Sequence, residues 1–511
     1  MEAALRAKGA DRRFAGEDWV ATVGIQARTI RALLATLESI RDTGRVPIRS
    51  GDVSVRPDGQ VVVRVNPMDQ WDRVLFPGWV GEIWLDPEVG IDDLDDHLGS
   101  FYTKAGVAEP GVGAVLGAGN VGSIAPLDAL HKLFVDGTTV IVKFNPVNEY
   151  IGPIFEEVFG DLIEEGFVRT AYGGSEVGFA VAHHPLVTEV HLTGSARTLE
   201  ALVYGMGPDG AARRAAGQRL LDKPVTSELG NVTPVIVVPG PWRDRDLRFQ
   251  AEHLATHSKQ NDGFTCNAAQ VLVLHDGWEL KEPFLRELRR VLGRLPARPA
   301  YYPGAEERWR RFADSHREVE YLGPVGPGQV PATLLLRVDP DSDHLAFREE
   351  SFCAVTATVE LGGDDAAGFL QRAVEFSNDR LSGDLSASVL VDPATAAELG
   401  DRLDAAIAGL RYGATGINVW TAASYGLGTA IWGGYPDHTD GTGSGSGFVH
   451  NGRLVDRPQR SVVAAPFRQF PKPAWFVTHR NATRALRRFA EFEAKPGLVR
   501  LLRTAAAVLR G

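Results

Sequence analysis

The sequence predicts an α/β protein whose strands form a mostly parallel sheet. From about residue 112, short apolar segments typical of buried strands alternate with segments of helical periodicity. The strand-like segments are Val112–Gly117, Thr138–Lys143 and Glu189–Thr193, and the helical ones between them are Ala125–Phe134 and Ile151–Glu165. This alternation is typical of βαβ units and therefore of a nucleotide-binding type of α/β domain.

The segments on either side of this run extend the prediction. Residues 25–40 have apolar side chains at helical spacing, and residues 53–65 form two β-rich runs around Asp58-Gly59, which predicts a hairpin. Residues 235–238 are expected to be the strand that closes the first run. A helix over 246–260 then leads into a loop, and a second α/β region follows, with a strand over 269–274.

Length and composition indicate the class of protein. A chain of 511 residues is longer than one hydrophobic core supports, so we expect two or three domains. The net charge of −11 argues against nucleic-acid binding, and two cysteines make neither a disulfide framework nor a Cys/His metal cluster. No signal peptide and no run of 18 apolar residues is present, so we expect a cytoplasmic protein without a metal centre.

The last sixty residues carry a charge opposite to that of the rest. Residues 452–511 contain thirteen Lys or Arg and three Asp or Glu, in a chain that is acidic elsewhere. Two segments, beginning at Arg480 and Leu498, have the pattern of basic amphipathic helices. They fit contact with a membrane surface, but we favour helices that dock on the protein's own acidic body or on a partner subunit.

Cys266 follows the turn sequence Asn261-Asp262-Gly263 and is the candidate nucleophile. A thiolate is reactive, whereas an unperturbed thiol is mostly protonated near neutral pH, so a catalytic cysteine needs supporting groups. The alternative is that Cys266 is only a small buried side chain.

Two glycine-containing turns were considered as phosphate sites. Gly111-Val-Gly113-Ala-Val-Leu-Gly117 has the wrong spacing for a dinucleotide fingerprint, and no acidic residue ends the next strand. Thr193-Gly194-Ser195 is the better candidate, because a helix begins there and its free N–H groups would face a phosphate. Ser195 taken alone would more often be an ordinary N-cap.

Several segments resemble, in collinear order, the signature motifs of the aldehyde dehydrogenase superfamily. The segments are Asn120, Val142-Lys143, His191-Leu-Thr193-Gly194-Ser195, Ser227-Glu228-Leu229-Gly230-Asn231, Gly263-Phe-Thr-Cys266 and Glu349-Glu350-Ser-Phe352. The likeness runs from about residue 110 to residue 450, and the chain is identified as a divergent member with some resemblance to acyl-CoA reductases.

This resemblance implies a fold and its domains. It implies a Rossmann-like cofactor domain, a second α/β catalytic domain and a small oligomerisation element. We therefore expect an N-terminal helical and hairpin region over 1–109 that packs on the cofactor domain, the cofactor domain over 110–235, and the catalytic domain over 236–435. Residues 436–511 would supply a Gly-rich loop, the oligomerisation segment and the basic helices of a homodimer or homotetramer.

The resemblance also implies a role for each residue. Cys266 would attack an aldehyde, Asn120 would stabilise the oxyanion, and Glu228 would activate the water that hydrolyses the thioester. The cofactor, NAD or NADP, would be held by five residues: Lys143, Gly194, Ser195, Glu350 and Phe352. Without the resemblance, Lys143 and Glu350 would be read as ordinary surface ion-pairing groups.

Departures from the family pattern leave several points open. Pro146 stands where an acidic residue normally binds the adenosine ribose, so the preference between NAD and NADP is undetermined. Ala118-Gly119 replaces the usual Pro-Trp before Asn120, the segment between Gly194 and Glu228 is about eleven residues longer than usual, and Cys353 follows Phe352 where a glycine is usual. We interpret Cys353 as a buried small residue.

Two other functions are alternatives to the oxidation of an aldehyde to an acid. One is a CoA-acylating aldehyde dehydrogenase or fatty acyl-CoA reductase, in which CoA and not water takes the acyl group. Glu228 favours hydrolysis, since attack by CoA needs no such base. The other rival is a non-catalytic protein of the same fold, which the presence of Cys266, Glu228 and Asn120 argues against.

The aldehyde itself is not identified by the sequence. Phe264, Trp420 and Trp432 lie in or near loops that could line an apolar tunnel, which slightly favours a bulky apolar substrate. Aromatic side chains of this kind are more often part of the core.

Overall fold

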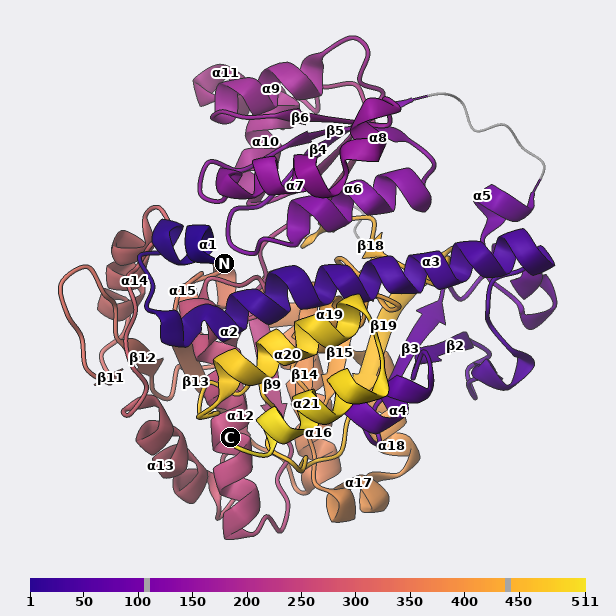
Figure 1. Cartoon of the computed structure of the whole chain (residues 1–511). Coiled ribbons are helices and arrows are strands. Elements are labelled where there is room, and N and C mark those ends of the chain that lie inside the picture. The colour runs from indigo at the N-terminus through magenta and orange to yellow at the C-terminus, as the bar shows by residue number, and fades with distance from the viewer. Residues whose placement is uncertain (105–110, 437–442) are drawn as a thin grey trace.

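The computed structural model describes residues 1–104, 111–436 and 443–511. Two β-sheets organise the molecule, a six-stranded sheet in the upper part of Figure 1 and an eleven-stranded sheet below it. A long helix, α3 (Ile25–Thr43), crosses between them. The expected junction at 109/110 and part of the Gly-rich loop after residue 436 fall outside the described residues.

The six-stranded sheet contains the βαβ units that the sequence predicts. Its order is β17-β8-β7-β4-β5-β6, and all neighbours except β17 and β8 are parallel. The strands are β4 (Val112–Leu116), β5 (Thr139–Lys143), β6 (Val168–Ala171), β7 (Glu189–Thr193), β8 (Val225–Glu228) and β17 (Gly445–Ser446). The helices are α6 (Ile124–Phe134), α7 (Gly152–Val158), α8 (Gly160–Glu164), α9 (Ser175–His183), α10 (Ala196–Tyr204) and α11 (Gly207–Ala215).

The larger sheet is parallel in its centre and antiparallel at both ends. Its order is β1 (Val53–Val55), β2 (Val61–Asn66), β3 (Val80–Leu85), β19 (Pro458–Ala464), β15 (Ala414–Ile417), β14 (Ser386–Leu390), β9 (Thr233–Val237), β10 (Ala269–His275), β13 (Val355–Leu361), β12 (Ala332–Leu335) and β11 (Val319–Leu322). The predicted hairpin is confirmed as β1 and β2.

Further elements surround the larger sheet. They are α4 (Gln70–Leu75), α5 (Ser100–Thr103), α12 (Asp244–Lys259), α13 (Lys281–Leu292), α14 (Ala305–Asp314), α15 (Leu345–Arg348), α16 (Ala366–Arg380), α17 (Pro393–Leu399), α18 (Asp401–Gly409), α19 (Ala422–Leu427) and the small pair β16 (Ile431–Trp432) and β18 (Val449–His450). The central strands β9 and β10 are buried along almost their whole length, as expected for parallel strands covered on both faces.

Two sequence predictions need correction. The strand expected to close the first run, residues 235–238, falls in β9, which lies between β14 and β10 in the larger sheet. The last parallel strand of the smaller sheet is instead the short β8. The single helix expected over Ile151–Glu165 is two helices, because the chain leaves helical geometry at Phe159 (ψ 27°) just before Gly160. Gly160 has a weak helix propensity, so a break there carries little cost.

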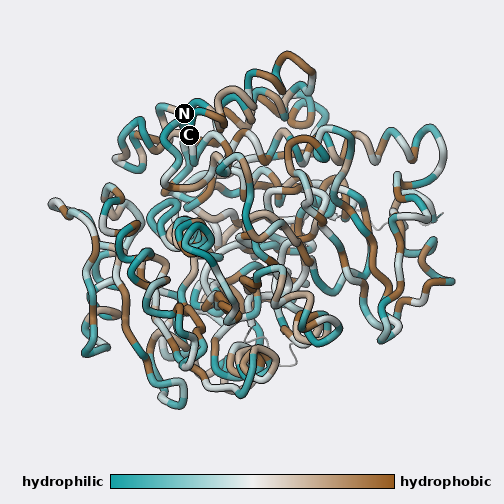
Figure 2. Tube along the Cα trace, turned by 90° about the horizontal axis from the view of Figure 1, so that it is seen from below, coloured by the Kyte–Doolittle hydropathy of each residue, from teal (hydrophilic) through white to brown (hydrophobic). Residues whose placement is uncertain are grey.

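The two ends of the chain pack against each other. The N-terminal part contains α1 (Glu2–Ala7), α2 (Ala15–Asp18), a π-helical turn over Trp19–Gly24 and α3, and it contacts α20 (Ala482–Ala494), which in turn packs on α21 (Leu498–Val508). Both ends lie on the same side of the molecule (Figures 1 and 2). No helix in the described part of the chain is long and apolar enough to cross a bilayer.

The basic tail therefore docks on the protein's own body, as we favoured, but its buried contact is not the basic-on-acidic pairing that we expected. Glu493 of α20 accepts hydrogen bonds from Arg28 and Arg31 of α3. Arg28 also donates two bonds of 2.7 Å to Asp72, and Asp72 is fully buried. These carboxylates raise the pKa of Arg28 despite its burial, so the guanidinium stays charged.

Candidate active site

Four of the predicted site segments lie at one edge of the smaller sheet. Lys143 ends β5, Thr193-Gly194 ends β7, Glu228 ends β8, and Asn120 follows β4 by four residues. Because these strands are parallel, their carboxyl ends meet at the same edge, where ligands bind in open α/β sheets. The topology thus brings together residues that are more than one hundred positions apart in the sequence.

Cys266 lies in a loop whose backbone is bent sharply just before it. Helix α12 ends at Lys259, and the next residues Asn261, Asp262 and Gly263 all have positive φ angles, of 50°, 57° and 79°. Asparagine, aspartate and glycine tolerate this region better than other residues. A side chain on Gly263 would meet the Cys353 carbonyl carbon at 2.5 Å, so glycine is required there.

The Cys266 thiol is partly buried at the inner end of a cavity. Burial raises the pKa of Cys266 well above its usual value, and the nearby carboxyl groups of Glu228 and Glu350 raise it further. The thiol is therefore protonated at neutral pH, and it needs a base to become a nucleophile.

Glu228 is the candidate for this base, because its carboxyl group lines the same cavity as Cys266. It is 3% exposed, and burial raises its pKa, while interactions with Trp432 and Cys266 lower it. Its Oε2 atom is buried and has no hydrogen-bond partner among the described residues. Native structures rarely leave such an atom unsatisfied, so its free lone pairs mark a place for a proton or a water molecule.

Asn120 lies beside the same cavity with its amide already oriented. Its Nδ2 donates a hydrogen bond of 3.1 Å to the carbonyl oxygen of Phe264, two residues before Cys266. An amide NH₂ group has two hydrogens, so one remains for an oxyanion. The Asn120 carbonyl is held in turn by Nδ2 of Asn261 at 3.2 Å.

Glu350 and Phe352 lie near the Cys266 loop: the Glu350 charge acts on the thiol, and the Phe352 ring lies 6.1 Å from that of Phe264. The Glu350 carboxyl group accepts a weak hydrogen bond from the Asn231 amide at 3.4 Å, and burial raises its pKa to about 8. The ring of Phe352 packs against Tyr302 with 4.8 Å between centroids. Glu350 is therefore not the exposed surface ion-pairing group of the alternative interpretation.

Lys143 and the turn at Gly194 were predicted to bind the cofactor, and both offer unused polar groups. Lys143 is 7% exposed, its ammonium makes no hydrogen bond or ion pair within the described chain, and burial lowers its pKa. Ser195 caps α10 by accepting a bond from the Thr198 amide at 3.2 Å, and the Gly194 amide bonds the Glu228 carbonyl at 2.9 Å. Ser195 is thus an N-cap, and the amides of Ser195 to Arg197 are the ones left to meet an anion.

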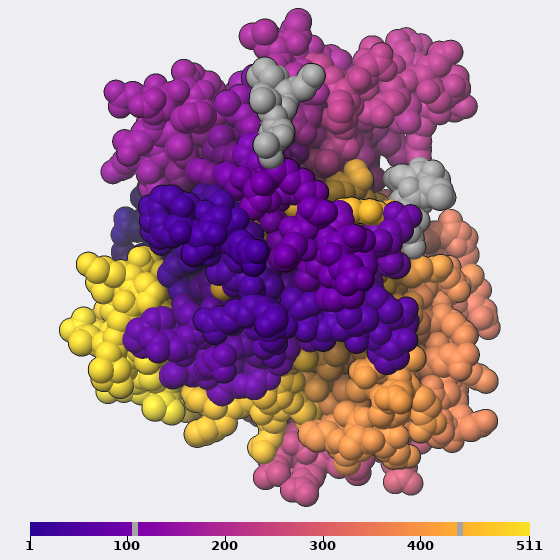
Figure 3. All heavy atoms as spheres, turned by 90° about the vertical axis from the view of Figure 1, so that its right-hand side faces the viewer, coloured from indigo at the N-terminus to yellow at the C-terminus, as the bar shows by residue number. Residues whose placement is uncertain are grey.

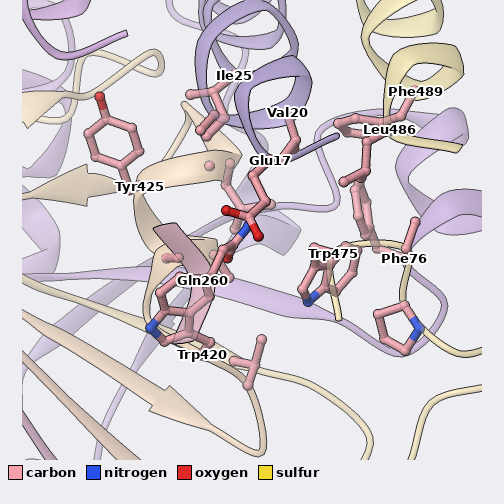
Figure 4. A pocket seen from close by; sticks show the side chains of 18 of the residues that line it. Glu17, Val20, Ile25, Phe76, Gln260, Trp420, Tyr425, Trp475, Leu486 and Phe489 are labelled. Carbon is pink, nitrogen blue, oxygen red and sulfur yellow. The ribbon is translucent and has the colours of Figure 1, made fainter. Parts of the chain in front are cut away.

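One cavity of about 600 Å³ joins the three predicted catalytic residues, Cys266, Glu228 and Asn120. In Figure 4, Gln260 and Trp420 lie at one end of it, Glu17 lies near the middle, and Phe76, Trp475, Leu486 and Phe489 form an apolar end. Trp420 and Trp432 line it, as the tunnel interpretation requires. Phe264 does not, because it is fully buried against Tyr301.

Sequence reasoning missed the contribution of the chain ends to this cavity. Residues of the first helices and of α20 and α21 supply much of its wall. Glu17 accepts a hydrogen bond of 2.8 Å from the Asn261 amide, and Lys8 donates to the Asn261 side chain at 3.3 Å. No local sequence motif predicts these contacts, since they join residues about 250 positions apart.

Buried Asp128 is a second residue that sequence reasoning missed. It accepts a hydrogen bond from Thr193 at 2.9 Å, and its pKa is raised well above the usual value by burial and by the charge of Glu228. Burial and the nearby Glu228 carboxylate thus both disfavour ionisation of Asp128. Its only sequence signal was its place on a helix, α6, that is buried over most of its length.

The arrangement of two sheets with a thiol loop between them defines an aldehyde dehydrogenase fold. Residues 103–302 match the family model described as "Aldehyde dehydrogenase family". The structure resembles lactaldehyde dehydrogenase from Escherichia coli (TM-score 0.54, 18% identity, 90% of this chain and 88% of the other). It also resembles the indole-3-acetaldehyde dehydrogenase of P. syringae in complex with NAD⁺ (TM-score 0.55, 17% identity, 90% and 84%).

Curated relatives match over a shorter stretch. The N-succinylglutamate 5-semialdehyde dehydrogenase of Sphingopyxis alaskensis is 28% identical over 197 residues, which cover 37% of each chain. The 4-trimethylaminobutyraldehyde dehydrogenase A of Danio rerio is 26% identical over 30% of this chain and 27% of its own length. The matched part spans 37% and 27% of the lengths of these two relatives. The chain is thus similar to aldehyde dehydrogenases over residues 103–302, and it shares their fold over about 90% of its length.

Proposed function

We propose that the protein oxidises an aldehyde to a carboxylic acid with NAD or NADP, through a thiohemiacetal and a thioester on Cys266. The observation that carries the proposal is that Cys266, Glu228 and Asn120 line one cavity, with a buried Glu228 oxygen left unpartnered. In this proposal the parallel strands of the smaller sheet, which lie within residues 110–235, belong to the cofactor domain, and the larger sheet belongs to the catalytic domain.

Glu228 serves first as the acceptor of the thiol proton. Burial raises the pKa values of both groups, so the proton transfer exchanges one disfavoured anion for another. The resulting thiolate attacks the carbonyl carbon, forming the S–C bond of a thiohemiacetal.

Asn120 and the backbone amide of Cys266 stabilise the oxyanion formed in this step. Asn120 uses the amide hydrogen that the Phe264 carbonyl does not occupy. The Cys266 amide donates to no other backbone group in the described part of the chain. One preorganised donor of this kind contributes roughly 3–4 kcal/mol to the transition state.

The oxidation itself depends on the nicotinamide cofactor, which when bound accepts a hydride. The chain's own residues fit such a group: Lys143 has a free ammonium for ribose hydroxyls, and the open N-terminus of α10 suits a pyrophosphate. A side chain on Gly194 would meet nothing closer than Leu192 at 3.6 Å, which leaves room for a ligand at the turn. Glu350 and Phe352 would hold the nicotinamide half.

Glu228 then releases the thiol proton to solvent, which restores the carboxylate, and acts a second time. It takes a proton from water while the water oxygen attacks the thioester carbon, the C–S bond breaks to release the acid, and the proton on Glu228 passes to the sulfur to regenerate the thiol. Glu228 Oε2, which lacks a hydrogen-bond partner, is the atom available for that water. This step favours hydrolysis over transfer of the acyl group to CoA.

We further propose that the aldehyde is bulky and apolar. Apart from the catalytic candidate Glu228, the charged groups in the cavity wall are already paired: Lys8 with Asp18, Glu17 with Arg298, Arg28 with Asp72 and Glu493, and Arg468 with Asp246. Paired charges offer little to an ionic substrate, whereas the apolar end contains Phe76, Trp475, Leu486 and Phe489.

An aldehyde panel tests the proposal directly. We expect reduction of NAD⁺ or NADP⁺ to be fastest with long-chain or aromatic aldehydes and to be independent of added CoA. Cys266→Ala should abolish turnover, while Cys353→Ala, which removes a fully buried thiol outside the cavity, should retain it. Activity in Cys266→Ala, or turnover only with CoA, would contradict the proposed chemistry.

A further inference from the structure

Helix α21 presents an apolar stripe to the outside. Leu498, Leu502 and Leu509 are about 60% exposed each, and their spacing of four and eleven residues places them on one face of the helix. Val499 extends this stripe. Large exposed side chains gathered in this way mark an interaction surface more often than a free surface.

The helix does not need this stripe for its own folding. Its other face, with Leu501, Thr504 and Ala507, is buried against the protein. His479 and Asn481 additionally contact the carbonyl groups of Val508 and Ala507 near its end, at 3.1 and 2.8 Å. The helix is anchored, and its exposed stripe is left for another partner.

The charges beside the stripe are all positive. Arg500, Arg503 and Arg510 are exposed, and no acidic residue follows Glu493. Arg503 and Arg510, seven residues apart, lie on one side of the helix and make no ion pair in the described part of the chain. Guanidinium groups beside apolar side chains complement the surface of a lipid bilayer, where a layer of phosphate groups covers the hydrocarbon chains.

The same face borders the mouth of the cavity. Leu502, Ala505 and Val508 of α21 line the cavity that contains Cys266, and so does Phe470, which is 87% exposed. In Figure 3 the C-terminal residues, in yellow, form a projecting flank of the molecule. An apolar path therefore leads from the exposed stripe toward the thiol.

We propose that the exposed face of α21, together with Phe470, docks on the surface of an anionic lipid bilayer. The leucines and Phe470 enter the interface, and the arginines lie at the level of the lipid phosphates. If the proposed function holds, a long-chain aldehyde dissolved in the bilayer enters the cavity at this contact. The docking itself does not depend on catalysis.

Vesicle co-sedimentation of the full chain tests the proposal. We expect binding to phosphatidylcholine vesicles that contain phosphatidylserine, much weaker binding to phosphatidylcholine alone, and loss of binding at high salt. Each arginine at an anionic surface contributes roughly fivefold, so Arg503→Glu/Arg510→Glu should weaken binding by about tenfold or more. Leu498→Asp/Leu509→Asp, outside the cavity wall, should weaken binding to a similar extent.

Leu186→Asp is the matched control, since Leu186 is 71% exposed on the smaller-sheet domain and should leave binding unchanged. Because all substituted residues are exposed, thermal unfolding should not change. Equal binding of wild type and both double variants would overturn the proposal. The proposal would also be overturned if the wild type did not bind vesicles and Leu498→Asp/Leu509→Asp dissociated a dimer. That result would show that the stripe contacts a second copy of the chain. Vesicle binding by Cys266→Ala separates docking from the chemistry.

Discussion

Glu17, near the start of the chain, accepts a hydrogen bond of 2.8 Å from the backbone amide of Asn261, five residues before the candidate nucleophile Cys266. The same carboxylate is bound by both terminal nitrogens of Arg298, at 2.6 and 2.8 Å. An N-terminal side chain thus fixes the strained turn that positions the thiol.

Glu17→Gln is expected to lower both activity and stability. The substitution leaves Arg298, which is 6% exposed, without its charged partner, and loss of such a partner costs roughly 3 kcal/mol. Displacement of the Cys266 loop should reduce kcat by about tenfold or more. Glu2→Gln is the control, because Glu2 is 72% exposed in its pair with Arg12. Unchanged kcat in Glu17→Gln would contradict this positioning role.

Glu228→Gln is expected to trap the acyl-enzyme. A carboxamide cannot take a proton from water, so the thioester on Cys266 should persist and add the acyl mass to the intact protein. At high pH, where the thiol ionises without help, the adduct should form fastest. The double variant Glu228→Gln/Cys266→Ala should show no adduct. Normal steady-state turnover by Glu228→Gln would exclude this base.

Glu350 should make stability fall with rising pH. Its pKa is about 8 in the folded protein, above the usual carboxyl value, so the folded state holds a proton that the unfolded state has released. Between about pH 4.5 and 8 the folded state binds more protons, and stability decreases with pH across that window. Glu350→Gln should therefore raise Tm relative to wild type more at pH 8.5 than at pH 5.5. Glu349→Gln, at an exposed neighbour, should show no such difference.

Arg28→Met is expected to weaken the contact between α3 and α20, in which Arg28 pairs with Asp72 and Glu493. The substitution leaves Asp72 and Glu493 buried without their shared cation, which should cost about 3–5 kcal/mol in urea unfolding. Arg41→Met removes a pair that is 71% and 59% exposed, and it should leave the stability almost unchanged because solvent screens such pairs. Equal losses of unfolding free energy in the two variants would show that the burial of Arg28, Asp72 and Glu493 does not strengthen their contribution to stability.

The sequence predicts the strand edge of this site better than its walls. Lys143 and Thr193 end strands that periodicity predicts, and parallel pairing brings their carboxyl ends to one edge of the sheet. The short strand β8, which ends at Glu228, was not predicted. The sheet to which β9 belongs was mispredicted, because strand character is local whereas the choice of neighbouring strand depends on distant residues.

The cavity wall was beyond sequence reasoning for the same physical reason. Glu17 and Leu502 belong to ordinary amphipathic helices, and nothing in a helical pattern specifies what its apolar face covers. The docking of α20 depends on Glu493, one of only three acidic residues in a strongly basic tail. The count of charges predicted that basic residues of the tail would pair with acidic residues of the body. The buried contact is the reverse, because one buried carboxylate, Glu493, pairs with arginines of α3 while most arginines of the tail stay exposed.

The joint of Arg28 with Asp72 and Glu493 has a consequence for the order in which the protein matures. Asp72 is close to Arg28 in the sequence, but Glu493 emerges from the ribosome long after both of them and after Cys266. Until then the wall contributed by α20 and α21 is absent, and the thiol of Cys266 has no apolar wall from these helices beside it. A site of this design is completed by helices made well after its candidate nucleophile, so a chain interrupted between them would carry the thiol without that part of its cavity.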